Sequence, residues 1–180
     1  MTKSNRPLIF LLHAAFFLTG VSTVLIGQVL PILAKRLALN DAELGQFFVA
    51  QFTGSLSGVF IYNFLVKKSG FVSGILVGLF SISCGALALN ANSWLACATG
   101  FFLIGIGTGT TLPGINMMVA ELNPLRTAAA LTVLNFFWGV GAILSQPFAA
   151  VLTREASIVL PTSVLAGAAA LIAVSLFPAA

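Results

Sequence analysis

The stretch WLACATGFFLIGIGTGTTLPGINMMVA, residues 94–120, decides the fold class of this chain. It carries no charged side chain and is longer than the roughly 20 helical residues that cross a bilayer core of about 30 Å. Long uncharged apolar runs of this kind are typical of transmembrane helices. The stretch therefore predicts a helix that crosses a membrane.

The rest of the sequence has the same character. Of its 180 residues, 59% are hydrophobic and 7% are charged, and the mean hydropathy is +1.09. This composition differs from that of soluble globular domains, so we expect the chain to lie in a lipid bilayer. The basic residues occur singly or in pairs and form no basic stripe. We therefore expect no nucleic-acid partner.

Charged, proline-rich and asparagine-rich breaks divide the sequence into apolar segments of transmembrane length. The breaks are too short to hold a folded domain, so we expect residues 1–180 to form one all-α bundle of six transmembrane helices. The first segment exceeds the hydrophobic region of a signal peptide and is expected to be retained. The expected spans are 8–34, 45–66, 71–89, 94–120, 128–152 and 158–177.

The distribution of basic residues predicts the orientation of these spans. With a cytoplasmic N-terminus, five of the eight basic residues lie inside, namely Lys3, Arg6, Lys67, Lys68 and Arg126. The positive-inside rule favours this arrangement, which places both termini in the cytoplasm. Short outer loops without glycosylation sites favour a bacterial inner (plasma) membrane.

A glycine pattern in the first and fourth segments suggests an internal duplication. In each segment two glycines lie seven residues apart and a proline follows, and the two segments run in opposite directions across the membrane. This pattern predicts 3+3 inverted repeats, a common architecture of transporters. The glycine-dense inner half of the fourth segment is also expected to bend or break at its proline. The matched residues are Gly20, Gly27 and Pro31 in the first segment and Gly100, Gly107 and Pro113 in the fourth.

Polar residues on one face of the fifth segment are the first candidates for a binding site. At about 100° per residue, Asn135, Trp138 and Gln146 share this face with Gly139 and Ala142. Carboxamides are costly in hydrocarbon, so they either hydrogen-bond a neighbouring helix or line a water-filled cavity. An aromatic plane beside amide donors suits a sugar-like solute.

Three other polar residues are candidates for the same site. Gln28 lies at the edge of the glycine-bearing face of the first segment, and Asn116 follows Pro113 in the fourth. His13 is the only histidine, and it acts either in a structural hydrogen bond or as a proton relay.

The sequence offers little for catalysis. Ser55 and Ser57 lie near the middle of the second segment, whereas His13 lies near the inner end of the first. A serine nucleophile needs a nearby base, so we expect no catalytic residues. No segment carries a cluster of metal-ligating side chains, and we expect neither a metal nor a cofactor.

With these features placed, the chain resembles the N-terminal six-helix half of a major facilitator superfamily transporter, and within that family the fucose permease-like sugar transporters. The motifs that carry the resemblance are FFLTG at 16–20 with Pro31, LVKKSG at 65–70, GIGTG at 105–109 leading to Pro113 and Asn116, and LNFFWGVGA at 134–142.

The sequence departs from the family's pattern at two points. The turn between the second and third segments carries Lys67, Lys68 and Gly70 but lacks the acid of the general signature, which puts the inner-gate charge network in doubt. Proton-coupled members are expected to carry a carboxylate in the first and fourth segments, where Gly27 and Leu112 stand here. The resemblance therefore does not imply proton coupling through this half.

The resemblance implies that the chain moves a small polar solute, specifically a sugar, by alternating access. Because the family has twelve spans, the chain is expected to be a truncated or half transporter that works with a second six-helix half or another copy. The alternative is a non-transporting membrane scaffold or assembly partner that binds another protein through Gly54 and Gly58, which have the spacing of close helix contacts.

Overall fold

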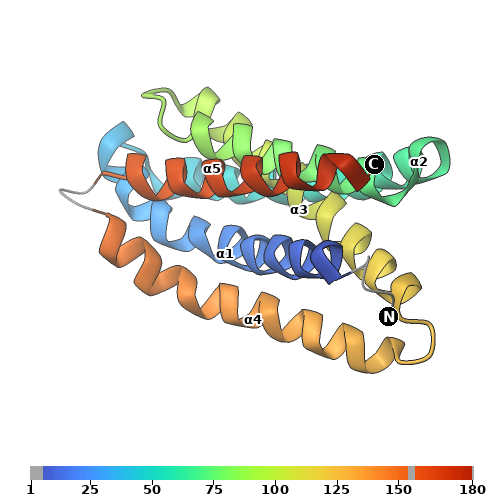
Figure 1. Cartoon of the computed structure of the whole chain (residues 1–180). Coiled ribbons are helices and arrows are strands. Elements are labelled where there is room, and N and C mark those ends of the chain that lie inside the picture. Colours follow the sequence, from blue (N-terminus) through green and yellow to red (C-terminus); the bar gives the residue numbers. More distant parts are fainter. Residues whose placement is uncertain (1–5, 154–156, 180) are drawn as a thin grey trace.

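The computed structural model describes residues 6–153 and 157–179, and these residues form an all-helical bundle (Figure 1). Each of its five α-helices is long and apolar enough to cross a membrane, and a 3₁₀ turn follows the last one. The predicted all-α class is confirmed. The elements are α1 (Arg6–Leu37), α2 (Asp41–Ala88), α3 (Trp94–Leu122), α4 (Thr127–Leu152), α5 (Val159–Leu176) and η2 (Phe177–Ala179).

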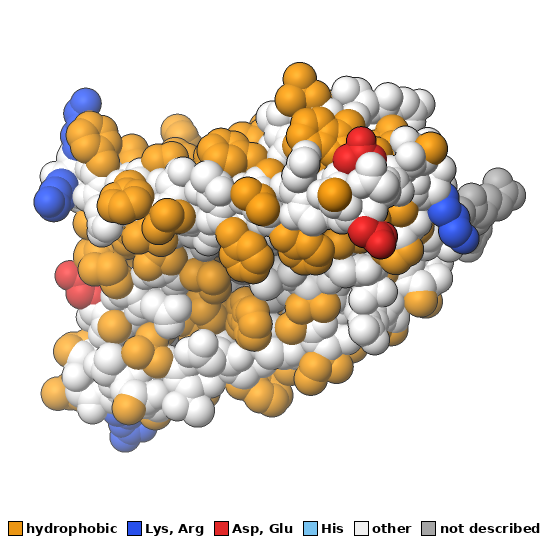
Figure 2. Space-filling model, turned by 180° about the vertical axis from the view of Figure 1, so that it is seen from behind, with side chains coloured by type: hydrophobic (Ala, Val, Ile, Leu, Met, Phe, Trp, Pro, Cys, Tyr) orange, Lys and Arg blue, Asp and Glu red, His pale blue; other side chains and the backbone are white. Residues whose placement is uncertain are grey.

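Charged and apolar side chains occupy different parts of the surface. On the face shown in Figure 2, hydrophobic side chains cover the long sides of the molecule, and the Lys, Arg, Asp and Glu side chains lie toward its two ends. This distribution is the one that a hydrocarbon layer between two aqueous phases requires, because ionised groups are costly inside the layer.

α2 contains a sharp reversal at Gly70. This residue has φ 81° and ψ 176°, which are not helical, and two helical arms join there. In a straight helix, Tyr62 and Gly74 would be about 18 Å apart, but an ideal Cβ on Gly74 would overlap the Tyr62 ring. The arm 41–69 and the arm 71–88 therefore run antiparallel and contact each other near Gly70, as the return of the chain near the α2 label shows (Figure 1). The second expected span lies within α2, and so does the third apart from its last residue, Leu89.

The first arm of α2 starts at a capping box. The Asn40 side chain accepts a hydrogen bond from the Glu43 backbone N–H at 3.0 Å, and the Glu43 carboxylate accepts one from the Asn40 N–H at 2.9 Å. These two bonds satisfy backbone groups that the first helical turn leaves unpaired. The connection between α1, which ends at Leu37, and α2, which begins at Asp41, is therefore short.

α3, which contains most of the stretch 94–120, packs between the two arms of α2. Its glycines meet backbone atoms on both sides, so the three helices approach more closely than side chains would permit. On the first arm the contacts are Gly54 with Phe102, Gly58 with Ile106, Gly105 with Gln51 and Gly109 with Ser55; on the second arm they are Gly78 with Gly107 and Gly85 with Gly100. The expected close packing of Gly54 and Gly58 is confirmed. The scaffold alternative requires this face to be free to bind another protein. In this structure α3 covers the face.

Of the expected bend or break of α3 at Pro113, the break is not found, because the helix is continuous from Trp94 to Leu122. Proline removes the backbone donor that would pair with the Gly109 carbonyl. Two hydroxyl groups nearby donate to a carbonyl one turn before Thr111 instead of to Gly109. Thr110 and Thr111 both donate to the Gly107 carbonyl, at 3.0 and 2.8 Å. The arms of α2 on both sides also hold the helix in place.

α1 and α4 form a second closely packed pair. A Cβ on Gly20 would collide with the Trp138 carbonyl, and one on Gly141 would collide with the Phe17 carbonyl. The Ser145 hydroxyl donates to the Val21 carbonyl at 3.1 Å. From the Phe17–Gly141 contact to the Val21–Ser145 contact the residue numbers rise by four on both helices, so the helices run parallel.

Replacing Gly141 with leucine is expected to destabilise the bundle by about 1–3 kcal/mol, because the new side chain has no room against α1. Gly139→Leu is the matched control, since nothing lies within 4 Å of a Cβ at that position. Thermal unfolding in detergent would compare the two. An equal loss of stability in both variants would contradict the close packing of α1 on α4.

Alanine at Gly70 is expected to destabilise the protein by about 1–2 kcal/mol, because the positive φ forces a Cβ against the backbone. Gly45→Ala should instead be neutral or stabilising by up to about 1 kcal/mol, since Gly45 lies in α2 with open space around it. The same unfolding assay tests both substitutions. A stabilising Gly70→Ala would show that the arms join in another conformation.

Candidate functional site

The two carboxamides of α4 lie on an exposed face of the helix. Asn135 and Gln146 are both exposed, and their spacing places them about 20° apart around the helix axis. The Asn135 amide donates to the Leu131 carbonyl of its own helix at 2.8 Å. Within the described residues, neither side chain hydrogen-bonds another helix of this chain. Of the two predicted roles for these carboxamides, the hydrogen bond to a neighbouring helix is not observed among the described residues of this bundle.

An exposed amide face on a membrane helix needs a polar environment. Two carboxamides facing lipid tails would lose the hydrogen bonds that water supplies. We refer to Asn135, Gln146 and the half-buried Gly139 between them as the amide face of α4. In the membrane this face must meet water or another protein surface.

Trp138 lies beside the amide face, about 60° around the helix from Asn135. Its side chain is half-buried, and its backbone carbonyl packs against Gly20 of α1. The indole Nε1 is buried and has no hydrogen-bond partner among the described residues. A buried donor without a partner costs about 1–3 kcal/mol, and a solute could reach Nε1 only if the surrounding side chains moved.

The candidates on α1 and α3 are half-buried. Gln28 follows Gly27, which is exposed and has no atom within 4 Å of an ideal Cβ. Pro31 removes the donor that would pair with the Gly27 carbonyl, so this carbonyl is a further acceptor beside Gln28. Asn116 donates to the Leu112 carbonyl at 2.7 Å. Among the described residues, no hydrogen bond joins any two of the candidate site residues directly.

His13 does not lie with the amide face. Its Nδ1 is 2.8 Å from the Ile9 carbonyl, and its ring meets Phe137 edge-on with centroids 5.1 Å apart. Phe137 is about 200° around α4 from Asn135, on nearly the opposite side of that helix. The parallel contact of α1 with α4 thus directs His13 away from the other candidates.

The residues of the predicted inner-gate loop surround the reversal of α2. Lys67, Lys68 and Gly70 are all exposed, at the end of the bundle that also holds the N-terminal end of α1. Because a single residue connects the arms, the two lysines belong to the last turn of the first arm. Cations at a helix C-terminus interact favourably with the helix dipole.

Sequence reasoning missed the role of Arg36. Its guanidinium donates to the Leu89 and Ala91 carbonyls, the latter at 2.9 Å, and lies 3.5 Å from the Cys97 sulfur. The arginine therefore binds the C-terminal end of α2 and ties it to the end of α1. The position of Arg36 in the last turn of a long apolar helix could have marked it as a structural residue. Its partners could not be predicted, because they are more than 50 residues away in the sequence.

Comparison with known proteins supports the same class of molecule. The family model of the Major Facilitator Superfamily matches residues 12–180. This range covers most of α1 and all of the other helices.

Three transporters are among the curated relatives. A gentisate transporter of Corynebacterium glutamicum is 30% identical over 134 residues, which cover 71% of this chain and 29% of the relative. A glucose/mannose transporter of Bacillus subtilis is 27% identical over 133 residues, 73% of this chain and 33% of the relative. A 4-hydroxybenzoate transporter of Pseudomonas putida is 27% identical over 141 residues, 76% of this chain and 31% of the relative.

The matched part of the chain spans about a third of the length of these relatives. The family match, by contrast, extends over nearly the whole chain, and the helices have the length and apolar composition of membrane spans. The chain is therefore a multi-pass membrane protein that belongs to the Major Facilitator Superfamily.

Proposed function

We propose that this chain moves a small polar solute, specifically a sugar, across a membrane by alternating access, together with a second six-helix unit. The observation that carries the proposal is the amide face of α4, which is exposed on a helix of membrane-spanning length and composition. A water-filled path between two units would supply the polar environment that this face needs.

The geometry of α2 supports six membrane crossings rather than five. A straight helix of 48 residues would be about 72 Å long, more than twice the bilayer core of about 30 Å. The reversal at Gly70 divides α2 into two arms, each long enough for one crossing. With six crossings, both termini lie on the same side of the membrane.

The packing of the helices supports an inverted 3+3 repeat. α1 runs parallel to α4, and α3 runs parallel to the first arm of α2. In a 3+3 repeat, α1 corresponds to α3 and the first arm of α2 corresponds to α4, so one parallel pair is the counterpart of the other. The glycine pattern that suggested the repeat is weaker support. Gly27 meets open space, whereas its predicted counterpart Gly107 packs against the second arm of α2.

The charges at the two ends support a cytoplasmic N-terminus. Among the described residues, Arg6, Lys67, Lys68 and Arg126 lie at the end that holds the start of α1, and Lys35 and Arg36 lie at the other end. By the positive-inside rule, the first end faces the cytoplasm. In a bacterium this membrane would be the inner membrane.

The unburied sides of α4 and of the first arm of α2 support a second unit as partner. Large hydrophobic side chains on both helices are exposed, and the amide face lies between apolar neighbours on α4. A second six-helix half or another copy would cover these surfaces and complete the path. The curated relatives are about three times as long as the part that this chain matches.

The chemistry of the candidate residues favours a neutral solute. Gln28, Asn116, Asn135, Trp138 and Gln146 supply amide and indole groups, which suit sugar hydroxyls. A carboxylate would call for a cation, and the described lysines and arginines lie toward the ends of the bundle. The glucose/mannose transporter among the relatives fits this choice, whereas the gentisate and 4-hydroxybenzoate transporters favour an aromatic acid as the second candidate. The proposal includes membership of the fucose permease-like subgroup of sugar transporters.

Alanine at Asn135 or Gln146 is expected to raise the KM for sugar uptake roughly threefold to tenfold, because each removes hydrogen bonds to the solute. Proteoliposomes that contain the chain and its second unit would be tested with labelled hexoses and with 4-hydroxybenzoate. Ser175→Ala is the matched control, since Ser175 is also exposed and also donates to a carbonyl of its own helix, that of Leu171.

Unchanged uptake in both amide variants would remove the amide face from the path. Uptake of 4-hydroxybenzoate but of no hexose would replace the sugar with an aromatic acid. Failure of the unmutated protein to move any solute of either class would count against transport itself.

Alkaline phosphatase fused after residue 179 is expected to be inactive in a bacterium, because the enzyme folds only outside the cytoplasm and six crossings return the C-terminus inside. A fusion at Asn92, between α2 and α3, should be active, and one at Leu125, between α3 and α4, should be inactive. Active phosphatase at residue 179 would indicate an odd number of crossings.

A further inference from the structure

A long apolar groove runs along α1 on the side away from the amide face. Its outer part is a cavity of about 710 Å³ between α1, α4 and α5, and its inner part is a cavity of about 530 Å³ between α1 and Phe137 of α4. Both cavities are lined by Phe17, so they adjoin. We refer to the two together as the α1 groove.

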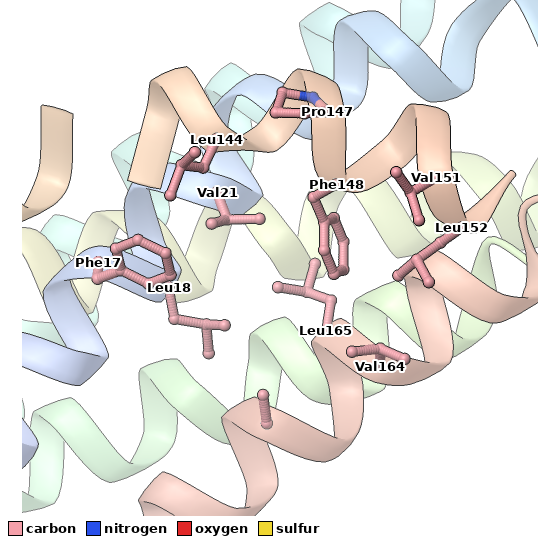
Figure 3. A pocket seen from close by; sticks show the side chains of 11 residues that line it. Phe17, Leu18, Val21, Leu144, Pro147, Phe148, Val151, Leu152, Val164 and Leu165 are labelled. Atoms are coloured by element: carbon pink, nitrogen blue, oxygen red, sulfur yellow. The ribbon is translucent and has the colours of Figure 1, made fainter. Parts of the chain in front are cut away.

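The lining of the groove is almost wholly apolar. In the outer part, Phe148 of α4 points toward Leu165 of α5, and Val21 of α1 lies nearby (Figure 3). In the inner part, Phe10 and Phe17 lie on α1. Arg6 and His13 are the polar side chains in the lining, and both belong to the inner part.

The groove is separate from the proposed path. Phe137 and Leu144, which line it, are about 200° and 180° around α4 from Asn135. His13, which the proposed path does not use, is therefore part of the groove. Residues of α5 line only the outer part of the groove.

The inner part has the dimensions of one bilayer leaflet. Arg6 and Phe17 are separated by about 16 Å along α1, and half of a bilayer core is about 15 Å. Arg6 is exposed at the start of α1, where the helix reaches the membrane surface. A cation at that depth attracts anionic headgroups, and an apolar channel of leaflet depth takes an acyl chain.

We propose that the inner part of the α1 groove binds a glycerophospholipid with an anionic headgroup. Its phosphate pairs with Arg6, and its acyl chain lies against Phe10, His13, Phe17 and Phe137. The His13 and Phe137 rings meet edge to face, and the Nδ1 of His13 lies 2.8 Å from the Ile9 carbonyl of its own helix, so Nε2 is the remaining polar atom of that ring. The site needs no transport activity, so it stands apart from the proposed function.

The lipid would also support the position of α4. This helix packs on α1 through Gly20 and Gly141 but has little contact with α5. An acyl chain beside Phe137 fills the space next to that contact. A bound lipid thus stabilises the helix that carries the amide face.

Native mass spectrometry of the full chain in detergent would test the site, with phosphatidylglycerol and phosphatidylcholine as probes. The unmutated protein is expected to bind phosphatidylglycerol about fivefold more tightly, and Arg6→Gln to lose that preference. Arg126→Gln is the matched charge control, because Arg126 is an exposed arginine at the same end of the bundle but outside the groove. It should keep the preference.

A second pair of variants tests the apolar part. Ala14→Phe fills the inner cavity and should weaken binding of both lipids, whereas Ala128→Phe adds the same bulk on an exposed position outside the groove and should not. The proposal is overturned if Arg6→Gln keeps the preference, if Arg126→Gln loses it equally, or if Ala14→Phe binds both lipids normally. Displacement of the lipid by 4-hydroxybenzoate would assign the cavity to a solute instead.

Discussion

The rest of the structure depends on backbone contact between helices at glycine. α3 touches Gln51 and Ser55 of the first α2 arm through Gly105 and Gly109, and it touches the second arm through Gly107. In hydrocarbon, apolar side chains gain little by leaving lipid for protein, so close packing must hold helices together. These contacts place α3 between the arms. α1 and α4 use the same device at Gly20 and Gly141.

The division of surfaces follows from this packing. α4 is held on α1 along one narrow side, which leaves most of its circumference uncovered. One uncovered side carries Asn135 and Gln146, and the opposite side carries Phe137 and Leu144. The two sides need different surroundings, one polar and one apolar. A single helix therefore borders both the proposed solute path and the proposed lipid groove.

Much of this architecture could be predicted because hydropathy alone identifies long apolar helices. The glycine spacing of Gly54 and Gly58 indicated close packing correctly. Of the bend or break expected at Pro113, the break is not found, since α3 is continuous there. The position of His13 could not be predicted. It depends on the parallel contact of α1 with α4, which sequence periodicity on one helix cannot reveal. The partners of Arg36 depend in the same way on contacts between distant segments.

The single-residue connection at Gly70 has a consequence for how the protein enters the membrane. With no loop between them, the two arms of α2 cannot insert as independent helices at separate times, because the second arm begins where the first ends. With the proposed cytoplasmic N-terminus, they are expected to leave the translocation channel as a helical hairpin whose tip faces the ribosome. Lys67 and Lys68 lie at that tip, so neither ammonium group needs to cross the hydrocarbon during biosynthesis.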